Sequence, residues 1–215
     1  MVNKKNFQDV SSDYDSSRSS GFLGKHVNKE RKLVLEFLNP KKNDVILDAG
    51  CGTGFYSLYS RSKGASVIGI DSSQTAISVY NSKGLNGFIG DIENISFDKQ
   101  FNKILCAGAL EFTKNPSKAI SCFSKSLKKN GIIVLVYPRN NFFGILYKLY
   151  HLSGLYFIPY GKLKLSKPVN IHLFSNNKIS SLMENNGFKI INDVKANVLT
   201  NVLVAVKNLS LSTTL

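Results

Sequence analysis

Acidic residues are scarce in this chain of 215 residues. Its 14 Asp and Glu stand against 28 Lys and Arg, which gives a formal net charge of +14. A positive field of this size favours acidic partners such as nucleic acid or an anionic membrane surface. However, the lysines are scattered, and no block of about five or six like charges marks a nucleic-acid-binding tail. The charge is therefore more typical of an ordinary solvated surface.

Cysteine is also rare, with only Cys51, Cys106 and Cys122. Their odd number and their spacing predict no metal site and indicate a reducing environment. The first ten residues hold lysines and polar groups without an apolar core, so no secretory signal is expected. The sequence has no internal repeat, and its length fits one domain. We therefore expect a cytoplasmic protein with a single domain over residues 1–215.

The most informative segment runs from Val45 to Gly54, with the sequence VILDAGCGTG. An apolar run ends in an acid and is followed by three glycines at alternate positions. This pattern predicts a buried parallel strand that ends in a tight turn, with backbone bare enough to lie against a ligand. Apolar and aromatic residues follow at helical spacing from Phe55. A turn between a strand and a helix N-terminus predicts a nucleotide-type cofactor site.

The glycine spacing and the next acids distinguish between cofactors. A third glycine at position 55 would complete G-x-G-x-x-G, but this chain has Phe55 there. Asp71 ends a second predicted strand about 20 residues on, where an acid binds the ribose of a nucleotide cofactor. Asp91 lies near the end of a third, Phe88 to Ile92. From Asp44 to Lys207 the chain resembles the class I S-adenosylmethionine-dependent methyltransferases, in particular their small-molecule branch.

The resemblance implies a Rossmann-like α/β fold, doubly wound, with a mostly parallel sheet of about seven strands and the last strand antiparallel. Further strands are expected at residues 104–108, 132–137, 188–194 and 198–206. Asn115 and Ser175 are expected to cap helices. Within the single domain we expect an N-terminal arm and helix over residues 1–40, a core over 41–208, and a substrate-side insertion over 139–168.

The same resemblance assigns roles to residues around the bound cofactor, S-adenosyl-L-methionine. The glycine turn would admit its methionine part, Asp48 would orient the turn, Asp71 would bind the ribose, and the residues after the fourth strand would line its reactive end. Tyr14, in a polar arm, is expected to contact the cofactor from above, with a mobile terminus as the alternative. The predicted cofactor-binding residues are Tyr14, Asp48, Gly50, Gly52, Gly54, Asp71, Asp91, Ile92, Ala107, Gly108 and Leu110.

The segment after the fourth predicted strand bears on the acceptor. It reads Cys106-Ala107-Gly108-Ala109-Leu110-Glu111-Phe112, without the Pro-Pro-aromatic or Pro-Cys segments of nucleic-acid methyltransferases, so nucleic acid is not expected as a partner. Cys106 lies in an apolar strand and is expected to be inert. Glu111 is either a substrate contact or a solvated loop acid.

Residues 142–160 form the least polar stretch outside the strands. If the first half is helical, Asn141, Gly144, Lys148 and His151 make a narrow polar stripe, and the rest is almost wholly apolar. The stretch is too short and interrupted to span a bilayer. Three interpretations stay open: a lid over an apolar substrate, an interfacial helix in peripheral contact with a membrane, and ordinary packing on the sheet.

Three histidines are candidates for a general base. His172 precedes the last helix, where similar enzymes that methylate hydroxyl groups often carry a histidine, and imidazole can accept a proton near neutral pH. His151 is the second candidate and His26 the third; a structural role is the alternative for each. We predict methyl transfer from S-adenosylmethionine to a small, apolar or lipid-like acceptor, with O-methylation favoured. The alternatives are an NAD-binding oxidoreductase and a methyltransferase-like protein that binds without turnover.

Overall fold

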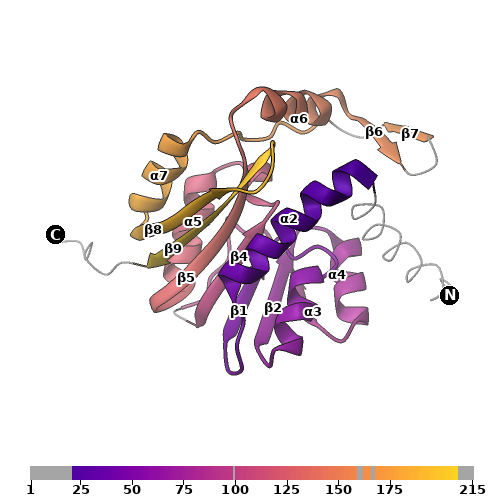
Figure 1. Cartoon of the computed structure of the whole chain (residues 1–215). Coiled ribbons are helices and arrows are strands. Elements are labelled where there is room, and N and C mark those ends of the chain that lie inside the picture. The colour runs from indigo at the N-terminus through magenta and orange to yellow at the C-terminus, as the bar shows by residue number, and fades with distance from the viewer. Residues whose placement is uncertain (1–20, 99, 159–161, 166–167, 208–215) are drawn as a thin grey trace.

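Helices cover both faces of a seven-stranded sheet in the computed structural model, which describes residues 21–98, 100–158, 162–165 and 168–207 (Figure 1). The strand order is β3-β2-β1-β4-β5-β9-β8. The sheet strands are β1 Val45–Ala49, β2 Ser66–Asp71, β3 Asn86–Ile89, β4 Phe101–Ala107, β5 Leu127–Pro138, β8 Phe188–Lys195 and β9 Thr200–Lys207. The helices are α2 Gly21–Leu38, α3 Phe55–Ser62, α4 Gln74–Ser82, η1 Leu110–Phe112, α5 Pro116–Ser126, α6 Phe142–Ser153 and α7 Asn176–Glu184.

The pairing of the strands confirms the expected fold class. Strands β3, β2, β1, β4 and β5 are mutually parallel, whereas β9, the last strand along the chain, runs antiparallel to both β5 and β8. The carboxyl ends of the parallel strands therefore meet at one edge, and the strand order reverses beside β1. In a doubly wound sheet this is where ligands bind.

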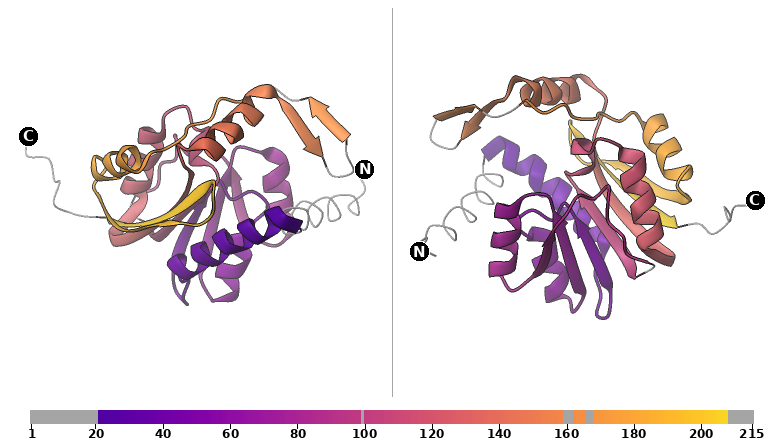
Figure 2. Two further views of the ribbon diagram at one scale, coloured as in Figure 1. Left: turned by 45° about the horizontal axis from the view of Figure 1, so that its top comes forward. Right: turned by 180° about the vertical axis from the view of Figure 1, so that it is seen from behind.

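Each face of the sheet buries its own core. On one face, Val34 and Leu38 of α2 pack on Ile46, Leu105 and Val134. On the opposite face, α5 and α7 cover the sheet (Figure 2) and contribute side chains that include Ile120, Phe123, Ile179 and Met183. The strands are apolar towards both layers because a mostly parallel sheet is covered on both sides.

The predicted helix caps are present. Asn115 Oδ1 accepts from Lys118 N at the start of α5, and Ser175 Oγ accepts from Lys178 N at the start of α7. The third strand differs from the expectation of Phe88 to Ile92, because β3 ends at Ile89. Its neighbour β2 ends opposite, at Asp71, so the chain after Ile89 has no strand to pair with and turns into a loop.

A short two-stranded unit lies outside the main sheet. After β5 the chain forms α6, followed by β6 Leu155–Ile158 and β7 Lys162–Leu165, which pair antiparallel. Figures 1 and 2 show α6 and this hairpin along one side of the molecule, beyond the carboxyl ends of the strands. Among the described residues, no helix is both long enough and apolar enough to cross a bilayer.

Candidate functional site

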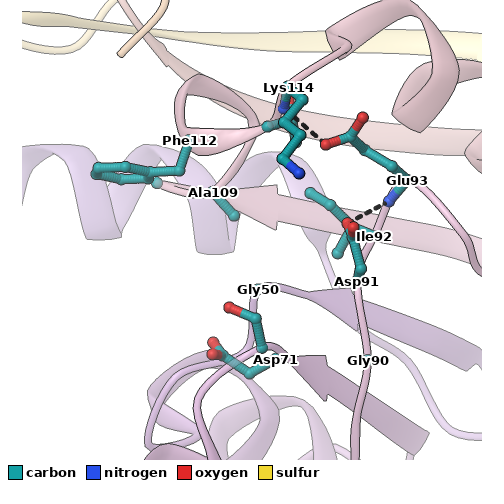
Figure 3. A pocket seen from close by; sticks show the side chains of 12 residues that line it. Gly50, Asp71, Gly90, Asp91, Ile92, Glu93, Ala109, Phe112 and Lys114 are labelled. Atoms are coloured by element: carbon teal, nitrogen blue, oxygen red, sulfur yellow. Dashed lines mark hydrogen bonds between the residues drawn. The ribbon is translucent and has the colours of Figure 1, made fainter. Parts of the chain in front are cut away.

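A cavity of about 350 Å³ opens at the carboxyl ends of β1, β2 and β4. Gly50 and Asp71 lie below the opening, Ala109 and Phe112 on one side, and Ile92 and Glu93 on the other (Figure 3). Its volume is within the range of small-ligand sites. The lining residues are Gly50, Asp71, Ser72, Gly90, Asp91, Ile92, Glu93, Gly108, Ala109, Phe112, Thr113 and Lys114.

The turn after β1 brings bare backbone to this cavity. Gly50 has φ +79°, and a Cβ built there would lie 2.2 Å from the Cβ of Ala109. Only glycine therefore allows the turn to pack against the loop after β4. Gly52 has φ +51°, and a Cβ there would meet nothing within 4 Å. The backbone at Gly52 consequently borders open space that a side chain would fill, which is the property a ligand cradle requires.

Asp71 is fixed by backbone donors on both sides. Its Oδ2 accepts from Gly52 N at 2.9 Å, and its Oδ1 accepts from Ser73 N at 2.8 Å. A carboxylate has about four acceptor positions, so these two bonds leave each oxygen able to accept one more. Because Asp71 also lines the cavity, it can accept hydrogen bonds from two neighbouring hydroxyl groups of a ligand.

Asp48 lies beneath the turn rather than in the cavity wall. It is buried, and Ser57 Oγ donates to its Oδ2 at 2.6 Å. Tyr80 Oη donates in turn to Ser57 Oγ at 2.8 Å. Burial raises the pKa of Asp48 from the ordinary 3.8 to about 6, against the lowering effect of the Ser57 hydrogen bond, and the charge of Asp71 raises it further. This chain of hydrogen bonds joins β1, α3 and α4 under the glycine turn.

The raised pKa of Asp48 gives a testable pH dependence of stability. The folded state binds this proton more tightly than the unfolded state, so the stability contributed by Asp48 is greatest below about pH 4 and falls until about pH 6. Asp48→Asn should flatten this fall in urea unfolding measured from about pH 4 to 7. Asp98→Asn, at an exposed position, is the control and should keep the wild-type slope. An unchanged slope in Asp48→Asn would contradict the assignment.

Glu93 connects two walls of the cavity and was not predicted from the sequence. This buried carboxylate accepts from Lys114 N at 2.6 Å through Oε1 (Figure 3) and from Asn115 N at 2.9 Å through Oε2. Asp91 Oδ1 accepts from Glu93 N at 2.9 Å. Glu93 thereby fixes the loop after β3 against the start of α5. Other lining residues that sequence reasoning missed are Ser72, Gly90, Ala109, Phe112, Thr113 and Lys114.

The predicted cofactor residues separate into two groups. Those in the cavity wall are Gly50, Asp71, Asp91, Ile92 and Gly108. Those outside the lining are Asp48, Gly52, Gly54, Ala107 and Leu110; Leu110, for example, is wholly buried in the core. Tyr14 lies outside the described residues. The contacts of all these residues with a ligand stay predictions.

Two of the three candidate histidines contact η1, the segment that carries Phe112. His172 N donates to the carbonyl oxygen of Glu111 at 2.9 Å. The buried ring of His151 makes edge contacts with Phe112, Tyr147 and Tyr150, with centroid separations of 5.3, 4.5 and 5.4 Å. Burial lowers the pKa of His151. Neither histidine lines the cavity, and the side chain of His26 is not described.

The structure shows how deeply Glu111 and Cys106, the two residues considered near the acceptor, are buried. Glu111 is only 4% exposed, so the interpretation as a solvated loop acid was wrong. Cys106 is fully buried, and burial raises its pKa, as expected for an inert core thiol. Among the described residues, no cluster of His, Cys, Asp or Glu could hold a metal ion.

The donors and acceptors of the site fit a nucleoside with a polar tail. Asp71 offers free acceptor positions for ribose hydroxyls, and Ile92 and Phe112 offer apolar surfaces for a base or a reactive end. The space beside Gly52 is open, and Gly108 also has a positive φ of +74° with nothing within 4 Å of a Cβ. The backbone at both glycines therefore borders open space.

Comparison with known proteins gives the following similarities. A family model described as a methyltransferase domain matches residues 24–192. An S-adenosylmethionine-dependent methyltransferase structure from Methanosarcina mazei has a TM-score of 0.64 at 25% identity, covering 82% of this chain and 97% of that one. Magnesium protoporphyrin IX methyltransferase from Synechocystis, solved with bound S-adenosylhomocysteine, shares the fold with a TM-score of 0.66 at 19% identity, covering 96% of this chain and all of that one.

Curated sequences are similar over parts of the chain. A ubiquinone biosynthesis O-methyltransferase of Pelagibacter ubique is 29% identical over 180 residues, which are 75% of this chain and 75% of that one. The protein of the same name from Pasteurella multocida is 29% identical over 130 residues, which are 51% of this chain and 54% of that one. The chain thus spans about half the length of the Pasteurella protein.

Proposed function

This chain belongs to the methyltransferase domain family and is an S-adenosylmethionine-dependent enzyme, and we propose that it methylates an oxygen atom of a small, apolar or lipid-like acceptor. Because the chain belongs to this family, the two alternatives, an NAD-binding oxidoreductase and a protein without turnover, are not retained. We further propose that residues 41–208 are the core of a single domain, and that residues 139–168 are the insertion bordering the acceptor. A cytoplasmic location, with peripheral membrane contact, stays a prediction.

The roles proposed for the binding residues follow from the cavity. S-adenosylmethionine supplies an electrophilic methyl group that leaves its own sulfur, so the protein needs chiefly to align the acceptor. Asp71 would accept hydrogen bonds from the ribose, and the backbone at Gly50 and Gly52 would lie along the methionine part. Ile92 would border the adenine, and Gly108 and Ala109 would border the reactive end.

The observation that carries the proposed acceptor is a row of contacting rings that extends from the cavity to α6. Phe112 lines the cavity, His151 packs on Phe112, and Tyr147 packs on His151. Phe112 therefore offers a ring surface on this side of the cavity, with further rings packed behind it, which suits an apolar acceptor. The named activity of the relatives, ubiquinone biosynthesis O-methylation, supports an oxygen nucleophile on an apolar molecule.

This row of rings makes a prediction for Tyr147, whose ring faces His151. Tyr147→Glu should lower turnover of an apolar acceptor about tenfold or more, because a charge would replace apolar contact surface. Phe143→Glu, from the same stretch, should act in the same direction. In both variants the affinity for S-adenosylhomocysteine should hold, since neither residue lines the cavity.

The assay uses an alkylated phenol dissolved in detergent, and mass spectrometry detects the methyl ether. Ile191→Glu, on the exposed edge strand β8, is the control and should keep the wild-type rate. Wild-type transfer to nitrogen or carbon acceptors but not to phenols would contradict O-methylation. Unchanged turnover in Tyr147→Glu would remove α6 from the acceptor site.

A further inference from the structure

Helix α6 exposes its apolar side and turns its polar side inward. Half of the exposed large apolar side chains in the described residues lie on this one helix, with exposures from 37% at Tyr150 to 69% at Phe142. They are Phe142, Phe143, Ile145, Leu146, Leu149, Tyr150 and Leu152. The buried residues of α6 are Gly144 and His151. The interpretation of this helix as ordinary packing on the sheet was therefore wrong.

Contacts at both ends fix the helix in this orientation. Asn141 caps it by accepting from Gly144 N at 2.8 Å, and Asn141 Nδ2 donates to the carbonyl of Val198 at 2.9 Å. A Cβ at Gly144 would lie 1.9 Å from the carbonyl oxygen of Arg139, so the helix rests directly on backbone. At the other end Val169 N donates to the carbonyl of His151 at 3.0 Å. The apolar side cannot turn inward without breaking these contacts.

The exposed side chains form one continuous ridge. Phe142, Leu146 and Leu149 are spaced four and three residues apart, which places them on the same side of the helix. The other apolar residues widen this ridge to about half of the helix circumference. Helices that lie in a membrane interface bury an apolar face in the lipid, and α6 presents such a face to solvent.

The charge of the protein distinguishes between occupants of this face. At +14, two copies meeting through α6 would repel each other, whereas an anionic bilayer would attract the protein. Lys162 and Lys164 follow the helix in the sequence, on strand β7. We propose that the apolar face of α6 docks on anionic lipid bilayers, an inference that rests on the proposed apolar acceptor because such an acceptor partitions into lipid.

Vesicle sedimentation of the full chain tests the docking. Wild-type protein should bind vesicles of phosphatidylglycerol and phosphatidylcholine, bind pure phosphatidylcholine less, and be released as salt rises, since screening weakens the electrostatic part. The triple variant Phe142→Gln, Leu146→Gln and Leu149→Gln should lower the partition coefficient at least about tenfold, because three apolar side chains no longer enter the interface. The double variant Ile191→Gln and Val194→Gln, which alters exposed apolar residues of β8, should bind like wild type.

Thermal unfolding, S-adenosylhomocysteine affinity and oligomeric state distinguish membrane docking from loss of folding and from dimer formation. Thermal unfolding and S-adenosylhomocysteine affinity should be the same in all variants, because the changed side chains are exposed. Absence of wild-type vesicle binding, or equal binding by the triple variant, would overturn the docking proposal. A wild-type dimer that the triple variant converts to monomers, without vesicle binding, would assign the face to a second copy. Methylation of the detergent-dissolved phenol tests the acceptor separately, so either proposal can fail alone.

Discussion

Replacing His172 by alanine is expected to lower the rate of methyl transfer about 100- to 10,000-fold, with S-adenosylhomocysteine affinity intact. Loss of this size is typical when a general base is removed. An oxygen nucleophile must lose its proton as the methyl group arrives, and imidazole can accept it near neutral pH. His172 is a candidate because its backbone is hydrogen-bonded to Glu111, one residue before Phe112 in the cavity wall.

The experiment compares variants of His172 and His151, the two histidines that contact η1. Single-turnover rates of methyl transfer are measured for the wild type and for folded His172→Ala, and the rate should fall in the variant. His151→Phe is the matched variant, since it preserves an aromatic ring among Phe112, Tyr147 and Tyr150, and it should keep the wild-type rate. A folded His172→Ala that keeps more than about a tenth of the rate would leave alignment as the source of catalysis.

Asp71→Ala is expected to weaken S-adenosylhomocysteine binding by about 1.5 to 3 kcal/mol, the range for hydrogen bonds to a charged group. The variant loses the acceptor for the ribose and also the acceptor for Gly52 N, which positions the glycine turn. Titration calorimetry measures the affinity. Asp71→Asn, which keeps one acceptor oxygen, should fall between the wild type and Asp71→Ala. Wild-type affinity in a folded Asp71→Ala would show that the ribose is bound elsewhere.

Local sequence signals predicted the elements around the glycine turn. The apolar run before Asp48, the glycines and the caps Asn115 and Ser175 each act within a few residues, and the structure has the expected strand, turn and helices. The end of β3 could not be predicted in this way. It depends on where the neighbouring strand β2 ends, at Asp71, and Phe88 and Ile89 are exposed at the sheet edge despite being apolar.

The site was predicted only in part, because local sequence signals mark some of its residues and contacts between distant segments place the others. Predicted strand ends marked Asp71 and Asp91, but Glu93 and Lys114 lie on loops and Phe112 on the three-residue helix η1, none of which has a periodic pattern. Their place in the cavity wall comes from contacts between distant segments, such as the Glu93 carboxylate with the backbone of Lys114. The polar stripe of α6 was visible in its spacing. Its inward direction was not, because that depends on contacts with distant segments, such as the hydrogen bond from Asn141 Nδ2 to the carbonyl of Val198.

The ring of Tyr80 limits how this sequence can change. A Cβ at Gly69 would lie 2.5 Å from Tyr80 Cζ, one at Gly87 would lie 2.6 Å from Tyr80 Cδ1, and one at Gly54 would lie 2.8 Å from Tyr80 Cδ2. Glycines on two strands and at the start of α3 thus form the slot for one phenol ring, and Gly54 serves this packing. A side chain at any of the three positions requires the Tyr80 ring to move or to be replaced by a smaller side chain. Gly54, one of the glycines that mark the cofactor turn, is therefore constrained by the Tyr80 ring as well as by its positive φ of +89°.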